Sequence, residues 1–276
     1  DIMAYDITAT IVTYNPKLDL LKEAINSFVT TSLNVKLYLV DNSPYPFEGH
    51  ECFLANDKIE YIYINGNRGF GAGHNVILRQ PSKMGKYHII LNPDISYSSG
   101  TIEALKDYMD NNQNIGNIMP KVFYPNGSLQ YLCKLLPSPM DWIVRRFIPI
   151  KLVQNRIDYK LEMRFTDYES IMNVPYLSGC FMFLRTSVIE EIGDFDEHIF
   201  MYGEDTDLNR RIYQKYQTIY YPKVSIIHNH EKGSHKNMKL LIIHIKAAIY
   251  YFNKWGWIFD KERRIINKQT IEKYSK

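Results

Sequence analysis

Cysteine is scarce in this sequence. The 276 residues include three cysteines, Cys52, Cys133 and Cys180, and no Cys-x-x-Cys pair. This spacing argues against a disulfide framework and against a zinc site built from cysteines. We therefore expect a protein of a reducing compartment.

Long apolar runs and a large net charge are also missing. No apolar run approaches the roughly 18 residues of a membrane span, and the N-terminus shows no signal peptide but leads straight into a strand-like segment. The net charge of +3 is too small to indicate a nucleic-acid partner. We expect a cytoplasmic protein that binds no nucleic acid and forms one large domain or two small ones.

The common phosphate-binding motifs are absent as well. The segment 67–75, Asn-Arg-Gly-Phe-Gly-Ala-Gly-His-Asn, is rich in glycine and precedes a helix that we expect over residues 76–79. It has neither the Gly-Lys-Ser/Thr of a Walker loop nor the Gly-x-Gly-x-x-Gly of a dinucleotide-binding turn. A glycine-rich turn before a helix suits a phosphate, but a tight loop without a ligand is an equally good interpretation.

Strands and helices alternate in the first half of the chain. Leu21, Ala24, Ile25 and Phe28 recur at helical spacing between two β-branched segments. This alternation predicts an α/β fold with a Rossmann-like, doubly wound, mostly parallel sheet. The strands expected in this half are 7–14, 35–40, 59–64 and 87–91.

The alternation stops near residue 117, so we expect a mixed second half followed by C-terminal helices. Asn126-Gly127 is a strong hairpin signal after a strand at 117–124. The last strands are expected at 220–222 and 224–227. The segment 137–168 is basic and aromatic; it could face a membrane or an acceptor, although a solvated helix packed on the domain is the more common case.

The stretch from Tyr87 to Ser96 organises the chain. Ile89, Ile90 and Leu91 form a run typical of a strand buried on both faces, which then stops at Asn92-Pro93-Asp94. Asp94 should lie just past the carboxyl end of this strand, where α/β sheets bind ligands. A carboxylate there can hold a divalent metal against a phosphate, whereas a simple Asn-Pro-Asp turn is the alternative.

Acidic residues gather where a helix should begin near Glu204. On the helical wheel Glu204 and Asp205 point near the buried face, and Asp207 points aside. Acids in a first turn can merely complement the helix dipole, but two that lean inward are costly without a partner or a function. Further on, His228 or His230 could join Asp94 on a metal, with a structural histidine as the alternative.

Taken together and in order, these stretches resemble the inverting family 2 glycosyltransferases of the GT-A fold, in particular the rhamnosyltransferase-like members that build bacterial polysaccharides such as O-antigen. Leu91-Asn92-Pro93-Asp94 is similar to this branch's variant of the DXD motif, with Asn92 in place of its first Asp. The other stretches that carry the resemblance are 10–15, 40–43, 67–75, 193–207 and 227–228.

The resemblance implies a role for each candidate residue. Asp205 would be the base that deprotonates the acceptor, with Glu204 positioning it, and Asp94 and His228 would hold Mn²⁺ or Mg²⁺. The donor would be a dTDP- or UDP-sugar, with rhamnose as the first choice. The residues implied to bind this nucleotide sugar are Thr13, Asn15, Asp41, Asn67, Gly71, Asn75 and Asn92.

The resemblance also implies a division of the chain and an acceptor. Residues 1–125 would form the nucleotide-sugar half and 126–235 the acceptor half of one GT-A domain, followed by a basic, aromatic tail at 236–276. The acceptor would be a glycan or a lipid-linked glycan, and the tail would make a peripheral contact with the inner face of the cell membrane. A nucleotidyltransferase and a non-catalytic binding module are the alternatives.

Overall fold

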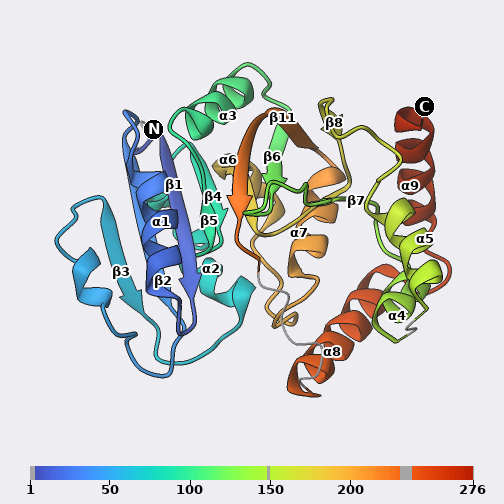
Figure 1. Cartoon of the computed structure of the whole chain (residues 1–276), viewed down its shortest axis with the longest axis horizontal. Helices are drawn as coiled ribbons and strands as arrows, with labels where there is room; N and C mark the ends of the chain where they lie inside the picture. The colour runs from blue at the N-terminus through green and yellow to red at the C-terminus, as the bar shows by residue number, and fades with distance from the viewer. Residues whose placement is uncertain (1–3, 148–149, 231–237, 276) are drawn as a thin grey trace.

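The computed structural model describes residues 4–147, 150–230 and 238–275. One mixed sheet crosses the molecule, and helices cover both of its faces (Figure 1). The first half is parallel, as predicted, because each strand returns to the same edge through a helix. Its strands are β1 (Ile7–Thr13), β2 (Val35–Asp41), β3 (Ile59–Tyr63) and β4 (Tyr87–Leu91).

The second half of the sheet is mixed, which confirms the predicted α/β class. β10 (Phe181–Arg185) lies antiparallel between β4 and β6 (Ile115–Phe123). β11 (Gln217–His228) runs parallel to β6 and antiparallel to β5 (Ile95–Ser96). The remaining strands are β8 (Met172–Asn173), which pairs with β11, and the separate pair of β7 (Cys133–Lys134) and β9 (Tyr176–Leu177).

Two strand predictions for this half were wrong. The segments 220–222 and 224–227 belong to the single strand β11, whose register shifts between Tyr221 and Ser225. Such a bulge lets the strand continue past Pro222 and resume its pairing with β6 at Ser225. The turn at Asn126-Gly127 closes only an isolated antiparallel bridge between Phe123 and Leu129, not a hairpin of two full strands.

Helices on the two faces of the sheet enclose two apolar cores. Ile89 and Leu91 of β4 pack toward the face with α1 and α3, whereas Ile90 packs toward the face with α2, α6 and α7. Successive side chains of a strand point to opposite faces, so a continuous apolar run is what this central strand needs. The helices are α1 (Leu18–Val29), α2 (Phe70–Leu78), α3 (Thr101–Asp110), α6 (Thr186–Ile192) and α7 (Glu204–Tyr213), with short 3-10 turns at His50–Phe53 and Pro81–Lys83.

Helix α2 begins at Phe70, six residues before the predicted start, and so contains glycines that the sequence assigned to a loop. Gly69 precedes it with a φ of 94°, which favours glycine. A Cβ on Gly73 would lie 2.7 Å from the side chain of Val12. The glycines therefore serve close packing of α2 on β1 as well as a turn.

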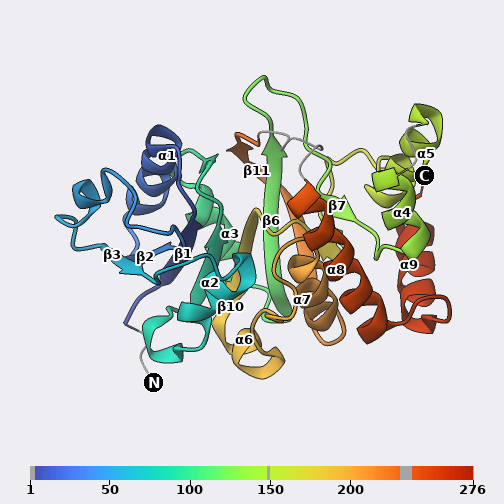
Figure 2. The same cartoon turned by 90° about the horizontal axis from the view of Figure 1, so that it is seen from below.

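Four more helices gather at one end of the molecule, beside α7 (Figure 2). α8 docks through Ala247, Tyr251 and Phe252. Across the described residues, no helix is both long enough and apolar enough to span a membrane. These helices are α4 (Pro139–Phe147), α5 (Lys151–Leu161), α8 (Met238–Trp255) and α9 (Lys261–Tyr274).

Candidate active site

The carboxyl ends of β1 and β2 place three of the predicted nucleoside-binding residues together. Thr13 and Asp41 are direct neighbours across the two strands. The Asp41 carboxylate is fully buried and accepts hydrogen bonds from the Tyr61 hydroxyl (2.6 Å) and from the backbone N–H groups of residues 43 and 47. The buried Thr13 hydroxyl has no partner, and Asn15, at a φ of 45°, is exposed.

The glycine-rich segment 67–75 packs against the segment 193–207, which contains the acidic residues. The amide of Asn75 is buried and exchanges hydrogen bonds with the backbone of Phe195, at 2.8 and 3.0 Å. A Cβ on Gly71 would lie 2.8 Å from the Phe195 side chain. Asn67, in contrast, is exposed and caps the turn by accepting from the N–H of Gly69. Within this segment, Asn67 is therefore open to a ligand, while Gly71 and Asn75, inside α2, hold that helix against Phe195.

Asp94 and His228 meet because β5 pairs with the end of β11. Ile95 lies opposite His228 in that pairing, and the Asp94 Oδ1 atom is 3.4 Å from the His228 Nε2 atom. Neither atom is accessible or makes a hydrogen bond. Burial opposes a proton on His228, but nearby Cys180 and Asp94 outweigh it and raise the pKa of His228 to about 10. The sheet thus joins two residues far apart in sequence.

Gln130 fixes the orientation of the His228 ring. Its amide N–H donates to the His228 carbonyl oxygen at 2.8 Å, so its carbonyl faces the His228 Nδ1 atom, which donates to it at 3.0 Å. Because Nδ1 carries a proton, the nitrogen that can bind either a metal or a second proton is Nε2, which lies toward Asp94. The sequence analysis missed Gln130, and no motif marks it.

The pair of Asp94 and His228 fits a divalent cation. An imidazole nitrogen and a carboxylate oxygen that are both buried and lack hydrogen bonds form a partial ligand set, and a metal can replace the proton between them. Among the described residues, no group of three or more His, Cys, Asp or Glu side chains could hold a metal. The remaining ligands would have to be water or the oxygens of a diphosphate.

Asp205 sits at the first turn of α7 in a tight set of hydrogen bonds. Its Oδ2 atom accepts from the N–H of Gly179 at 2.8 Å and from the Tyr176 hydroxyl at 3.1 Å. Its Oδ1 atom accepts from the N–H of Thr206 at 2.8 Å. These three donors fix the direction of the carboxylate.

Glu204 is the more deeply buried of the two acids. Burial, and then the charge of Asp205, raise the pKa of Glu204 well above its usual range. Its Oε2 atom has no hydrogen bond. Two adjacent carboxyl groups in one pocket, one of them with a raised pKa, form an arrangement that suits proton transfer.

The interpretation of Asp207 as pointing aside was wrong. Asp207 is fully buried and its carboxylate contacts Arg211 at 2.9 Å, Lys254 at 2.8 Å and the indole N–H of Trp255 at 2.8 Å. The helical wheel could not show this because α8, which supplies two of these partners, lies far along the chain. Asp207 thus anchors α8 to α7.

One pocket of about 970 Å³ brings together Asn92, His228, Glu204 and Asp205. The predicted nucleoside-binding residues do not line it; they lie at the neighbouring sheet edge formed by β1 and β2. The pocket therefore lies between the candidate metal ligand His228 and the acidic pair of Glu204 and Asp205.

The far wall of the pocket carries residues that the sequence analysis did not single out as ligands. Lys134 lies with its Nζ atom 5.1 Å from the ring centre of Tyr176, which in turn contacts Asp205. Burial and the nearby Arg145 lower the pKa of Lys134. Trp142, from the segment 137–168, donates to the ring of His244 at 3.0 Å. Aromatic rings and a cation on one wall suit a sugar that carries a phosphate.

Gly179 gives a test of this geometry. A Cβ there would lie 2.8 Å from the Asp205 Cβ, so Gly179→Ala must displace the carboxylate. We expect turnover to fall roughly a hundredfold, because small misplacements of reacting groups are costly, while donor affinity measured by calorimetry stays unchanged. Gly100→Ala, in an open turn away from the pocket, is strained by its φ of 90° and so is the control for a general loss of stability. Normal turnover by Gly179→Ala would show that Asp205 needs no fixed position.

Solved structures share this fold. The crystal structure of GalNAc-T7 with UDP, GalNAc and Mn²⁺ aligns with a TM-score of 0.68 at 14% identity, over 90% of this chain and 48% of that one. The mannosyltransferase PcManGT from Pyrobaculum calidifontis, in complex with GDP-Man and Mn²⁺, aligns with a TM-score of 0.59 at 13% identity, over 97% of this chain and 69% of that one. This chain spans about half the length of GalNAc-T7. These likenesses confirm the GT-A fold.

Sequence comparison identifies the family. An N-acetylglucosaminyl-diphospho-decaprenol L-rhamnosyltransferase from Mycobacterium tuberculosis is 25% identical over 89% of this chain and 84% of its own length. The low-salt glycan biosynthesis hexosyltransferase Agl10 of Haloferax volcanii is 24% identical over 74% of this chain and 61% of its own length. The family model for glycosyl transferase family 2 matches residues 8–193. Because that match takes in more than half of the chain, the protein belongs to glycosyl transferase family 2 and is a glycosyltransferase.

Proposed function

We propose that this glycosyltransferase moves L-rhamnose from dTDP-rhamnose to a lipid-linked glycan, with a divalent metal and with inversion at the anomeric carbon. The observation that carries this proposal is the pocket in which His228, held against Asp94, faces Glu204 and Asp205. The mycobacterial relative, an L-rhamnosyltransferase named for a diphospho-decaprenol substrate, supports the choice of sugar and acceptor.

The donor would lie along the carboxyl ends of β1, β2 and β4. The unpartnered Thr13 hydroxyl, the exposed Asn15 and the exposed Asn67 offer groups for the nucleoside and sugar. Asp41 keeps the loop after β2 in shape through its three hydrogen bonds, which leaves about one lone pair, on its Oδ1 atom, to accept from the base or ribose.

Asp94 and His228 would hold Mn²⁺ or Mg²⁺, with Asn92 beside them. When bound, the cation would stabilise the negative charge that grows on the departing diphosphate. Gln130 would keep the His228 Nε2 atom directed at it.

Asp205 would take the proton of an acceptor hydroxyl as its oxygen forms the new bond to the anomeric carbon. The bond from that carbon to the diphosphate oxygen breaks on the opposite side, so the configuration inverts. Gly179 and Tyr176 hold the Asp205 carboxylate in place, and Glu204 would position the base or the acceptor.

We also propose a division of labour along the chain. Residues 1–125 would bind the donor and 126–235 the acceptor, and the basic tail at 236–276 would bring the enzyme to the inner face of the membrane, where cations are attracted to anionic lipids.

Donor hydrolysis tests the proposal. With Mn²⁺ or Mg²⁺, a panel of dTDP-, UDP- and GDP-sugars should show slow release of dTDP from dTDP-rhamnose, and EDTA should stop it. Asp94→Ala should lower this release by roughly a hundredfold, because the metal loses a carboxylate ligand. Asp19→Ala, which removes an exposed carboxylate from α1, is the matched control.

The outcomes separate the parts of the proposal. Equal release in EDTA would exclude metal dependence, and release from a different donor would correct the sugar. If no donor is hydrolysed in the absence of an acceptor, transfer to a lipid-linked acceptor is the assay to use. The anomeric configuration of the transfer product, read by NMR, decides whether the reaction inverts.

A further inference from the structure

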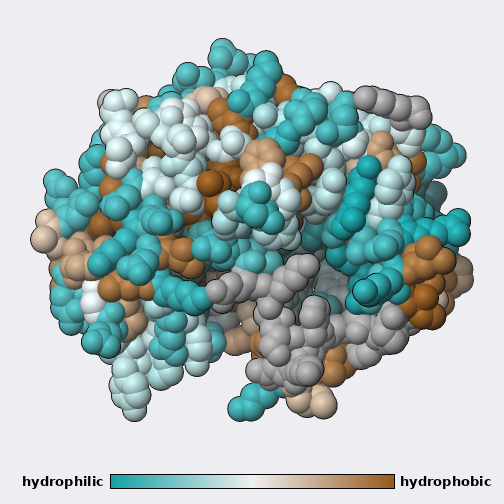
Figure 3. Space-filling view, viewed as in Figure 1, coloured by the Kyte–Doolittle hydropathy of each residue, from teal (hydrophilic) through white to brown (hydrophobic). Residues whose placement is uncertain are grey.

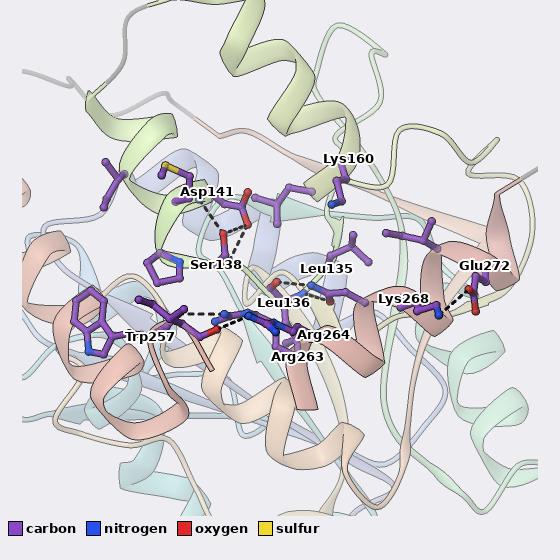
Figure 4. Close-up of a pocket in the computed structure, with 17 residues that line it drawn as sticks. Leu135, Leu136, Ser138, Asp141, Lys160, Trp257, Arg263, Arg264, Lys268 and Glu272 are labelled. Carbon is purple, nitrogen blue, oxygen red and sulfur yellow. Dashed lines mark hydrogen bonds and ion pairs between the residues drawn. The ribbon is translucent and has the colours of Figure 1, made fainter. Parts of the chain in front are cut away.

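We propose that a second hollow, between α4, α5 and α9, binds the lipid end of the acceptor, a long apolar chain that terminates in phosphate. This inference rests on the proposed transfer to a lipid-linked glycan. The α4–α9 hollow has a volume of about 790 Å³ (Figure 4). The residues that carry the argument are Leu135, Leu136, Ile143, Lys160, Ile258 and Arg264.

The floor and rim of the α4–α9 hollow are apolar. Leu135 and Leu136 are buried at its floor. On its rim, Ile143 of α4 is 47% exposed and Ile258, in the corner between α8 and α9, is 66% exposed. Apolar side chains that face solvent around a hollow mark a binding surface. The brown surface seen in Figure 3, at the place that α4 and α5 occupy in Figure 1, shows that apolar atoms continue at this end of the molecule.

Cations stand around this apolar hollow. Lys160 projects from the end of α5, and Arg264 and Lys268 project from α9 (Figure 4). The Lys160 ammonium has no hydrogen bond or ion pair to any described residue, and the Lys268 ammonium is 3.7 Å from Glu272 in an exposed pair that is weak in water. A neutral apolar ligand would leave Lys160 unused, whereas an apolar chain with an anionic end would match both features.

The α4–α9 hollow adjoins the active pocket. Asp141 and Leu161 line both of them. The chain that leaves β7 also runs from one cavity to the other. Lys134, the last residue of β7, lines the active pocket, and Leu135 and Leu136 line the hollow. An acceptor whose sugar lies at Asp205 can therefore extend past Lys134, with its phosphate near Lys160 and its apolar chain in the hollow. This shared border selects the acceptor's own lipid as the occupant.

Binding of dodecyl phosphate below its micelle concentration tests the inference without any turnover. By calorimetry, the full chain should bind dodecyl phosphate more tightly than inorganic phosphate or dodecyl maltoside. Ile143→Glu and Ile258→Glu should each weaken it about tenfold, because a carboxylate then lies in the apolar contact. Both positions are exposed, so these variants should fold. Ile249→Glu, at a 45% exposed position on α8 outside the hollow, is the matched control.

A further variant tests the anionic end. Lys160→Gln should reduce the preference for dodecyl phosphate over dodecyl maltoside and leave the maltoside affinity unchanged. Equal weakening by Ile249→Glu would mean nonspecific adsorption, and unchanged binding by Ile143→Glu would remove the hollow as the site. A dimer in solution that Ile143→Glu dissociates would assign this face to a second copy of the chain instead.

Transfer assays keep this inference separate from the proposed function. The Ile143→Glu variant should retain metal-dependent release of nucleotide diphosphate and transfer to a short-chain acceptor, while losing about tenfold in kcat/KM for the long-chain form, a difference of one decade in apparent affinity. Absence of donor turnover in the unaltered protein would count against the proposed function and leave the dodecyl phosphate result standing.

Discussion

Replacing Asp205 by Asn should lower turnover roughly thousandfold, the usual scale for losing a general base, while leaving donor binding intact. Asn has nearly the same shape and keeps an oxygen that can accept from the N–H of Gly179. It cannot take the proton of the acceptor hydroxyl. Steady-state transfer with saturating donor, together with calorimetry of donor binding, checks both halves of this expectation.

Glu204→Gln is the comparison that makes the result specific. Part of the rise in the pKa of Glu204 comes from the charge of Asp205, so Asp205→Asn should bring the pKa of Glu204 down toward its usual range. If Glu204 only positions its neighbour, Glu204→Gln should retain far more turnover than Asp205→Asn. Near-normal turnover by Asp205→Asn with collapse of Glu204→Gln would assign the base to Glu204.

Replacing Asp260 by Ala should lower the free energy of unfolding by about 3–5 kcal/mol, the scale for breaking a buried ion pair from one side. The Arg210 guanidinium is almost fully buried and makes two hydrogen bonds of 2.7 Å to the Asp260 carboxylate. It also lies over the ring of Trp255, 4.2 Å from its centre. Without Asp260, this charge keeps the Trp255 ring and the half-exposed carboxylate of Glu262 as its neighbours. The melting temperature should fall by roughly 10 °C.

Two variants separate the charge effect from other losses. Asp260 also caps α9 by accepting from the N–H of Arg263, and Asp260→Asn keeps that cap while removing the charge. The double variant Arg210→Met/Asp260→Asn also removes the buried Arg210 charge, so part of the stability should return. Glu191→Ala, in an exposed pair with Lys215, should change the melting temperature little. Full stability of Asp260→Ala would mean that α9 is not held by this pair.

The pair of Arg210 and Asp260 also links the C-terminal helices to α7, the helix that carries the proposed base Asp205. Helix α7 carries Asp205 at its first turn and Arg210 further along, while Asp207 holds Lys254 of α8. Any variant that frees α8 and α9 should therefore loosen the helix that positions the base. The described part of the basic tail, residues 238–275, therefore supports the helix that carries Asp205 through these contacts.

Helix α2 and Asp207 show where sequence patterns misled. The glycines of 69–73 suggested a loop, but Gly71 and Gly73 lie inside α2. These helix positions are glycine because a Cβ would not fit against Phe195 and Val12. Asp207 occupies a helix position that usually faces water, yet α8 covers it. In both cases, the deciding contact comes from a residue remote in sequence.

The sequence by itself determined what local chemistry controls. Apolar and β-branched runs set the parallel strands, the central strand ends at Leu91 before Pro93 and Asp94, and a helix starts at Glu204, as predicted. Only the tertiary structure decided which groups meet. Pairing of β5 with β11 brings His228 to Asp94, and the turn at Gly179 reaches Asp205. Packing of α4 and α9 forms the second hollow. Strand and helix signals act over a few residues, whereas the site depends on backbone pairing and packing between distant segments, which no short pattern encodes.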